Sequence, residues 1–164
     1  MVIRNRRGIT LAEVMITVAI LGILFSIGPQ LLKHVTRFYL LSRTRIQLQR
    51  DARAALSLMT RNIKQAQNAT IVLDHIAGQP YYSRITFTKQ DGTITQYYQS
   101  GTNLIMNAGG IQRTLADTLL FVVFIFPESD DMTLITVGLT LQKSIYEGEI
   151  KDLHMAIEKT QIMN

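Results

Sequence analysis

The sequence predicts an α+β chain in which one long N-terminal helix precedes a β-rich domain. Between Val14 and Leu32 no side chain carries a charge. Apolar residues then recur at spacings of three and four as far as Ala66, the period of a helix with one buried face. From residue 70 onward the pattern changes to short alternating segments separated by Gly, Asn and Asp, which is typical of antiparallel strands.

The uncharged run from Val14 to Leu32 is long enough to cross a membrane. As a helix its 19 residues would reach about 28 Å, and the hydrocarbon core of a bilayer is about 30 Å thick. Lys33 and Arg37 follow the run, and a short basic leader precedes it, with Arg4, Arg6 and Arg7. Because basic residues flank both ends, charge alone does not orient the segment.

Glu13 at the entrance of this run is a residue that a simple anchor does not need, because burying a carboxylate in hydrocarbon costs several kcal/mol. The segment Gly8-Ile9-Thr10-Leu11-Ala12-Glu13, directly after the basic leader, resembles the type IV prepilin motif. The resemblance implies that a prepilin peptidase cuts between Gly8 and Ile9 on the cytoplasmic side and then N-methylates Ile9. Most members of that family carry Phe at the methylated position, so Ile9 is a departure.

The resemblance also implies that Glu13 of one subunit meets the positive N-terminus of its neighbour in a filament. A local pairing is the alternative, because Ile9 and Glu13 lie four residues apart on one helix. Two other interpretations of the whole segment compete with the prepilin one. The first is a secretory signal peptide cut after Ser26-Ile27-Gly28, where the following Pro29 should hinder cleavage. The second is a plain signal anchor.

Composition limits the remaining function classes. The chain has 164 residues and no Cys, which excludes disulfides and thiolate metal sites. About 130 residues remain beyond leader and anchor, enough for one domain with its own core. Without the three leader arginines the net charge falls from +5 to +2, so nucleic acid is not an expected partner. The residues 33–64 hold eight basic side chains and one acidic one, whereas 65–164 hold six basic and ten acidic.

No catalytic or metal-binding arrangement is indicated. His34, His75 and His154 lie far apart and show no HxxxH or HExxH spacing. Glu128, Asp130 and Asp131 offer oxygen ligands for Ca²⁺, but a solvated acidic loop is the favoured interpretation. We therefore expect no enzyme activity, no metal and no cofactor.

The expected elements begin with one helix from Ile9 to about Gln67, bent or locally opened at Gly28–Pro29 and ended by Asn68–Thr70. Its arginines are expected on the solvated face, or else paired with acidic surfaces of neighbouring subunits. Strands are expected at 71–73, 84–88, 94–99, 104–106, 119–126 and 133–142, with a hairpin turn at Asp91-Gly92. The run "LLFVVFIF" at 119–126 predicts a strand buried on both faces. The alternation at 153–162 favours a terminal strand over a short helix.

This order is that of the pilin fold, and we assign four segments. They are a leader (1–8), a transmembrane and assembly helix (9–32), an amphipathic stem (33–69) and a β-rich head (70–164). The stretch "RDARAALSLMTRNIKQAQNATI" and the later "YYQSGTNLIMNAGG" resemble the J-type minor pseudopilins of type II secretion and the W-type minor pilins.

That resemblance implies a structural subunit of a pseudopilus or pilus, placed in its tip or initiation complex. Its expected partners are other pilin subunits, prepilin peptidase, the inner-membrane assembly platform and, before assembly, membrane lipid. The expected location is the inner membrane with the head outside the cytoplasm. The alternatives are a signal-anchored binding or enzymatic domain, and a DNA-uptake pilin, for which the basic stem is the only indication.

Overall fold

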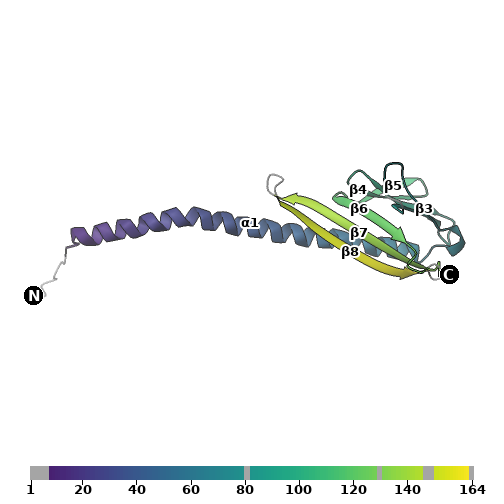
Figure 1. The fold of residues 1–164 in the computed structure, drawn as a ribbon, viewed down its shortest axis with the longest axis horizontal. Helices are drawn as coiled ribbons and strands as arrows, with labels where there is room; N and C mark the ends of the chain where they lie inside the picture. The colour runs from purple at the N-terminus through teal and green to yellow at the C-terminus, as the bar shows by residue number, and fades with distance from the viewer. Residues whose placement is uncertain (1–7, 80–81, 129–130, 146–149, 163–164) are drawn as a thin grey trace, which may run out of the picture. The chain divides into compact units, whose positions relative to one another are not determined.

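The fold is that of a long apolar N-terminal helix packed on antiparallel sheets, a pilin-like α+β fold, as predicted (Figure 1). The computed structural model describes residues 8–79, 82–128, 131–145 and 150–162. Its elements are α1 (Leu11–Ile63), a 3-10 turn (Asn68–Thr70), β1 (Val72–Asp74), β2 (Arg84–Thr88), β3 (Ile94–Ser100), β4 (Asn103–Ala108), β5 (Ile111–Ala116), β6 (Leu119–Ile125), β7 (Leu134–Ile145) and β8 (Ile150–Gln161).

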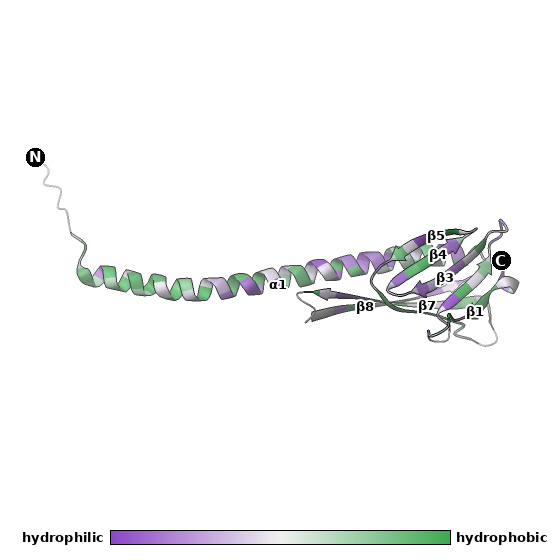
Figure 2. Cartoon of the chain, turned by 90° about the horizontal axis from the view of Figure 1, so that it is seen from above, coloured by the Kyte–Doolittle hydropathy of each residue, from purple (hydrophilic) through white to green (hydrophobic). Residues whose placement is uncertain are grey.

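The chain forms two compact units, Met1–Leu40 and Leu41–Asn164, and α1 contributes to both. In the first unit the side chains from Leu11 to Tyr39 are all exposed. Figure 2 shows that most of this part of α1 is hydrophobic. The helix continues without a break through Pro29, so the local opening expected there does not occur.

In the second unit the C-terminal part of α1 is amphipathic. Its buried side chains recur at spacings of three and four, the pattern that the sequence shows. They are Leu48, Ala52, Ala55, Leu56, Met59 and Ile63. These residues join both sheets in one hydrophobic core, with Phe87 and Tyr97 from the first sheet and Phe124 and Val137 from the second.

The helix ends at Ile63, four residues earlier than the sequence predicted. The backbone of the residues after Ile63 forms hydrogen bonds with the β2–β3 hairpin instead. Gln67 donates its N–H to the carbonyl of Thr88 at 2.9 Å, and Gln65 accepts from the N–H of Gln90 at 3.0 Å. Because these groups pair with the hairpin, they are not available to continue the helical ladder.

The first sheet has the order β1-β2-β3-β4-β5, and each pair of neighbours is antiparallel. The predicted strand at 84–88 and the Asp91-Gly92 turn are confirmed, and Ile85 and Phe87 are fully buried on one face. The strand β5 was not predicted. The signal for it is Gly109-Gly110, both of which have positive φ, because two such residues form a hairpin turn that implies a returning strand.

The second sheet has the order β6-β7-β8, so the head contains two antiparallel sheets. The segment "LLFVVFIF" does form a strand, but the prediction that both its faces are buried is wrong. Leu120, Phe121 and Ile125 are exposed on β6. The strand with both faces buried is β7, whose residues 135–141 are all buried. Its other face carries the small residues Thr136, Gly138 and Thr140, and the side chain of Val123 on the neighbouring strand lies over Gly138.

The strand β8 confirms the expected terminal strand, which pairs with β7 over its full length. The alternating apolar side chains that predicted it face away from the core. Leu153, Met155 and Ile157 are all more than half exposed, whereas Asp152 and Thr160 are buried. Period two therefore identified the strand but not the face that it buries.

Candidate processing and assembly site

The residues around the predicted cleavage position lie just before α1. Gly8, Ile9 and Thr10 are outside the helix and exposed, and α1 begins at Leu11. Apart from its two neighbours in the chain, no heavy atom of the described residues lies within 4 Å of a Cβ placed on Gly8. The peptide bond between Gly8 and Ile9 is therefore accessible from outside.

Thr10 and Glu13 form a reciprocal cap at the start of α1. The carboxylate oxygen Oε2 of Glu13 accepts hydrogen bonds from the backbone N–H of Thr10 at 2.9 Å and from its hydroxyl at 3.1 Å. In return, the backbone N–H of Glu13 donates to the Thr10 hydroxyl oxygen at 3.3 Å. This is a capping box, in which an N-cap Thr and a Glu three residues later satisfy each other's unpaired amide groups.

The structure thus gives Glu13 a local partner, but a different one from the Ile9 terminus considered above. The capping role of Thr10 was not predicted. The signal was present in the sequence, because Thr-x-x-Glu directly before an apolar run is a standard helix-start pattern. The leader residues Arg4, Arg6 and Arg7 lie outside the described residues.

The apolar helix after this cap meets the length and composition expected of a membrane-spanning segment. Its large apolar side chains are exposed, for example Leu11, Met15 and Phe25. Exposed apolar surface of this extent is stable only in lipid or against other apolar helices. The segment is therefore suited to an anchor in the membrane and to helix packing after assembly.

The segment around the cleavage position is also the part of the chain that matches a known family. A family model described as "Prokaryotic N-terminal methylation motif" matches residues 3–28, which include Gly8, Ile9 and Glu13. The chain carries a prepilin-type cleavage and methylation motif. With the fold above, this motif makes the chain similar to type IV pilin-like proteins, a class whose members are typically structural subunits. No curated protein and no solved structure matches the chain.

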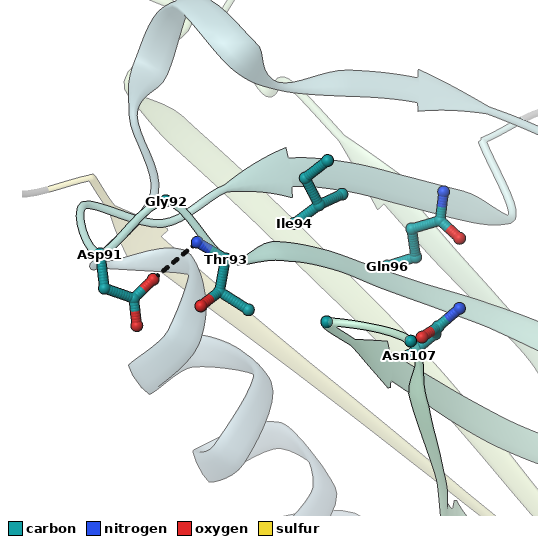
Figure 3. A pocket seen from close by; sticks show the side chains of 8 residues that line it. Asp91, Gly92, Thr93, Ile94, Gln96 and Asn107 are labelled. Carbon is teal, nitrogen blue, oxygen red and sulfur yellow. Dashed lines mark hydrogen bonds between the residues drawn. The ribbon is translucent and has the colours of Figure 1, made fainter.

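The head contains an open groove between two hairpin turns (Figure 3). Asp91 and its neighbours form one wall, and Gln96 and Asn107 reach the groove from adjacent strands. The Asp91 carboxylate accepts from the N–H of Thr93 at 2.8 Å, and this bond holds its pKa below the ordinary value. The one carboxylate of the groove thus stabilises its own turn, so the groove presents no catalytic pair.

In the acidic loop considered for calcium, a carboxylate also stabilises its own turn. Asp131 accepts hydrogen bonds from the backbone N–H of Thr133 at 2.8 Å and from its hydroxyl. Asp130 lies outside the described residues. Among the residues that the structure describes, no group of three or more His, Cys, Asp or Glu side chains is placed to hold a metal ion.

Proposed function

We propose that this chain is a minor pilin or pseudopilin, a structural subunit of a type II secretion pseudopilus or a type IV pilus. The observation that carries the proposal is the start of α1. There a prepilin-type motif, an exposed Gly8–Ile9 bond and a capped apolar helix occur together in one chain. The placement in a tip or initiation complex is supported by the resemblance of residues 50–71 and 97–110 to the J-type and W-type minor subunits.

The proposed processing step is hydrolysis of the peptide bond between Gly8 and Ile9 by prepilin peptidase. Water adds across this bond, so the leader leaves with a carboxylate at Gly8 and the mature chain begins with an α-ammonium at Ile9. N-methylation of Ile9 then keeps that positive charge. The cap at Thr10 supports this step. It marks the start of α1, so the helix begins only at Leu11 and the backbone of Gly8 and Ile9 stays outside it.

Cleavage also supplies Glu13 with a counter-charge for assembly. Two unit charges 4 Å apart attract by about 4 kcal/mol at an effective dielectric of 20. We propose that Glu13 of one subunit pairs with the Ile9 ammonium of its neighbour and sets the axial register of the stems. In the free chain, the two hydrogen bonds from Thr10 stabilise the carboxylate until that partner arrives.

Before assembly, the proposed location is the inner membrane, with the apolar part of α1 in lipid and the head outside the cytoplasm. The partners are then the assembly platform, sister subunits and the peptidase. The head supports a structural role, because its described residues form a packed core, and the Asp91 carboxylate in the groove between the hairpin turns is already hydrogen-bonded within its own turn.

The experiment that tests this function is expression of the full chain with an active prepilin peptidase and, in parallel, with an inactive variant of it. The mature protein should begin at Ile9, with or without one methyl group, only in the presence of the active enzyme. Intact mass measurement and N-terminal sequencing read this directly. A leader that stays on, or a start at Pro29, would reject the assignment in favour of an anchor or a signal peptide.

A further inference from the structure

The part of α1 in the second unit carries a row of cations on the side that faces away from the core. We call this row the basic seam, and it consists of Arg43, Arg50, Arg53, Arg61 and Lys64. All five side chains are exposed. At 100° per residue they fall within an arc of about 80°, along about 32 Å of helix. Lys64 lies just past the end of α1 but keeps the helical bond from its N–H to the Thr60 carbonyl, at 3.0 Å.

The basic seam has no counter-charge in the described part of the chain. The ion pairs found there are Arg45–Asp152 and Arg84–Asp74, which do not involve it. The one acid of this helical stretch, Asp51, faces another groove, beside Thr114–Asp117. Two pairs within the seam, Arg50 with Arg53 and Arg61 with Lys64, are like charges three residues apart and repel each other.

A further cation strengthens the positive field at the flank of the seam. Lys143 of β7 donates from its Nζ to the Oε1 of Gln47 at 3.2 Å, so its charge lies beside the same helix face. The free chain therefore maintains a line of repelling charges that an anionic partner would relieve. A second copy cannot do so with its own seam, because two such seams repel.

The shape of the seam indicates which anionic partner fits. Small exposed side chains, Ala54 and Ser57, lie between the cations of the central turns. Positions 43, 50, 57 and 64 repeat every seven residues, the spacing at which a second helix can follow a first. A helix backbone can approach closely at Ala54 and Ser57, while arginine forks on either side bind carboxylates.

Single-stranded nucleic acid fits less well. Such strands are bound by cations interleaved with aromatic side chains on which the bases stack. Residues 41–64 contain no aromatic residue. We propose that the basic seam docks a helix of another subunit that presents Glu or Asp side chains along one face at seven-residue spacing. This inference rests on the proposed role as an assembly subunit and specifies the chemistry of its partner.

The test uses the full-length processed chain in a zwitterionic detergent and a labelled designed helix as the probe. The helix carries Glu at the first and fifth positions of each of three heptads. One control probe is a sequence isomer with the same glutamates spread over all faces, and another is a 24-nucleotide single-stranded DNA. We expect the patterned helix to bind about tenfold more tightly than its isomer, and its binding to weaken as salt rises.

Charge reversal then locates the contact. The variant Arg50→Glu/Arg61→Glu should lower the affinity for the patterned helix by about tenfold. The matched control is Arg113→Glu/Lys159→Glu, which makes the same change in charge at exposed positions of β5 and β8 and should leave binding unchanged. A neutral variant, Arg50→Gln/Arg61→Gln, should show an intermediate loss and guards against misfolding caused by the reversal.

The proposal is overturned if the isomer or the DNA binds as tightly as the patterned helix, because the seam would then be a non-specific anionic surface. It is also overturned if the control variant loses as much affinity as the seam variant. Leader removal is measured on the same preparations. Normal processing without helix binding rejects the seam alone, whereas absent processing rejects the proposed function.

Discussion

Thr10 and Glu13 bond to each other's backbone amides, so the carboxylate that we propose sets the filament register already has a partner within its own chain. This cap fixes where α1 begins and keeps the Gly8–Ile9 bond outside the helix. It also means that assembly would exchange one set of contacts of Glu13 for another. Substitutions at Thr10 and Glu13 therefore report on different steps.

Replacing Thr10 by Ala should loosen the first turn of α1. The change removes the hydroxyl that accepts from the N–H of Glu13, and losing such a cap costs about 1 kcal/mol. Hydrogen exchange at the Glu13 amide of the detergent-solubilised chain should become faster. The control Thr10→Ser keeps the hydroxyl and should exchange like the parent, and equal exchange in all three proteins would show that the cap does not form.

Gly138 on β7 is covered by the side chain of Val123 on β6. A Cβ added at Gly138 would lie 2.8 Å from the Cγ1 of Val123, so Gly138→Ala should destabilise the head by about 1–3 kcal/mol through overpacking. The double variant Gly138→Ala/Val123→Ala should recover most of that loss. Urea unfolding of the three variants and the parent forms a double-mutant cycle, and purely additive losses would place Val123 elsewhere.

Tyr97 and Asn62 form a buried polar contact between α1 and the first sheet. The side-chain amide of Asn62 donates to the Tyr97 hydroxyl, and Lys89 donates to the Asn62 carbonyl oxygen at 3.0 Å. Tyr97→Phe leaves the buried amide without that acceptor, at a cost of about 1–2 kcal/mol. Hydrogen exchange of β3 should therefore accelerate, whereas Tyr98→Phe, on the opposite face of the strand, should have little effect.

The sequence was sufficient for the elements that follow a regular period. Spacings of three and four found α1, and the alternation in 84–88 found β2 with Ile85 and Phe87 inward. The sequence-based prediction was wrong where contacts between distant segments decide where an element ends. The helix ends at Ile63 because the β2–β3 hairpin binds the following backbone, a contact that local pattern does not contain.

Which strand is buried on both faces could not be predicted from the local sequence either. The apolar run at 119–126 looks doubly buried, yet it lies at the side of a three-stranded sheet, and the mixed run of β7 lies at its centre. Sequence period encodes neither the strand order nor the neighbouring side chains, such as Val123, that cover the small residues of β7. For the site, the motif predicts roles for Gly8, Ile9 and Glu13, whereas the capping role of Thr10 follows from the geometry of the helix start.

Acid should weaken the head partly through Asp74. Hydrogen bonding from Arg84 holds the pKa of Asp74 below its ordinary value. The stabilisation from this pair is therefore complete above about pH 4, where the unfolded Asp is also ionised, and is lost as the pH falls through the lower folded pKa. Asp74→Asn should flatten the dependence of unfolding on pH below 4. If the free energy of unfolding of the parent and of the variant fell equally with pH below 4, the Asp74–Arg84 pair would not contribute to acid sensitivity.

The central claim is that Glu13 joins one subunit to the next, and Glu13→Gln in the full chain tests it most directly. A Gln at this position can still accept from the Thr10 amide, as capping boxes with Gln do, and Gly8 is unchanged, so leader removal should stay normal. The neighbour's ammonium would however remain unpaired in an apolar helix bundle, a penalty of several kcal/mol. We expect recovery of the processed variant with co-expressed sister subunits from membranes to fall well below that of the parent chain. Recovery equal to the parent, with normal leader removal, would contradict the intersubunit role and leave the cap with Thr10 as the function of Glu13.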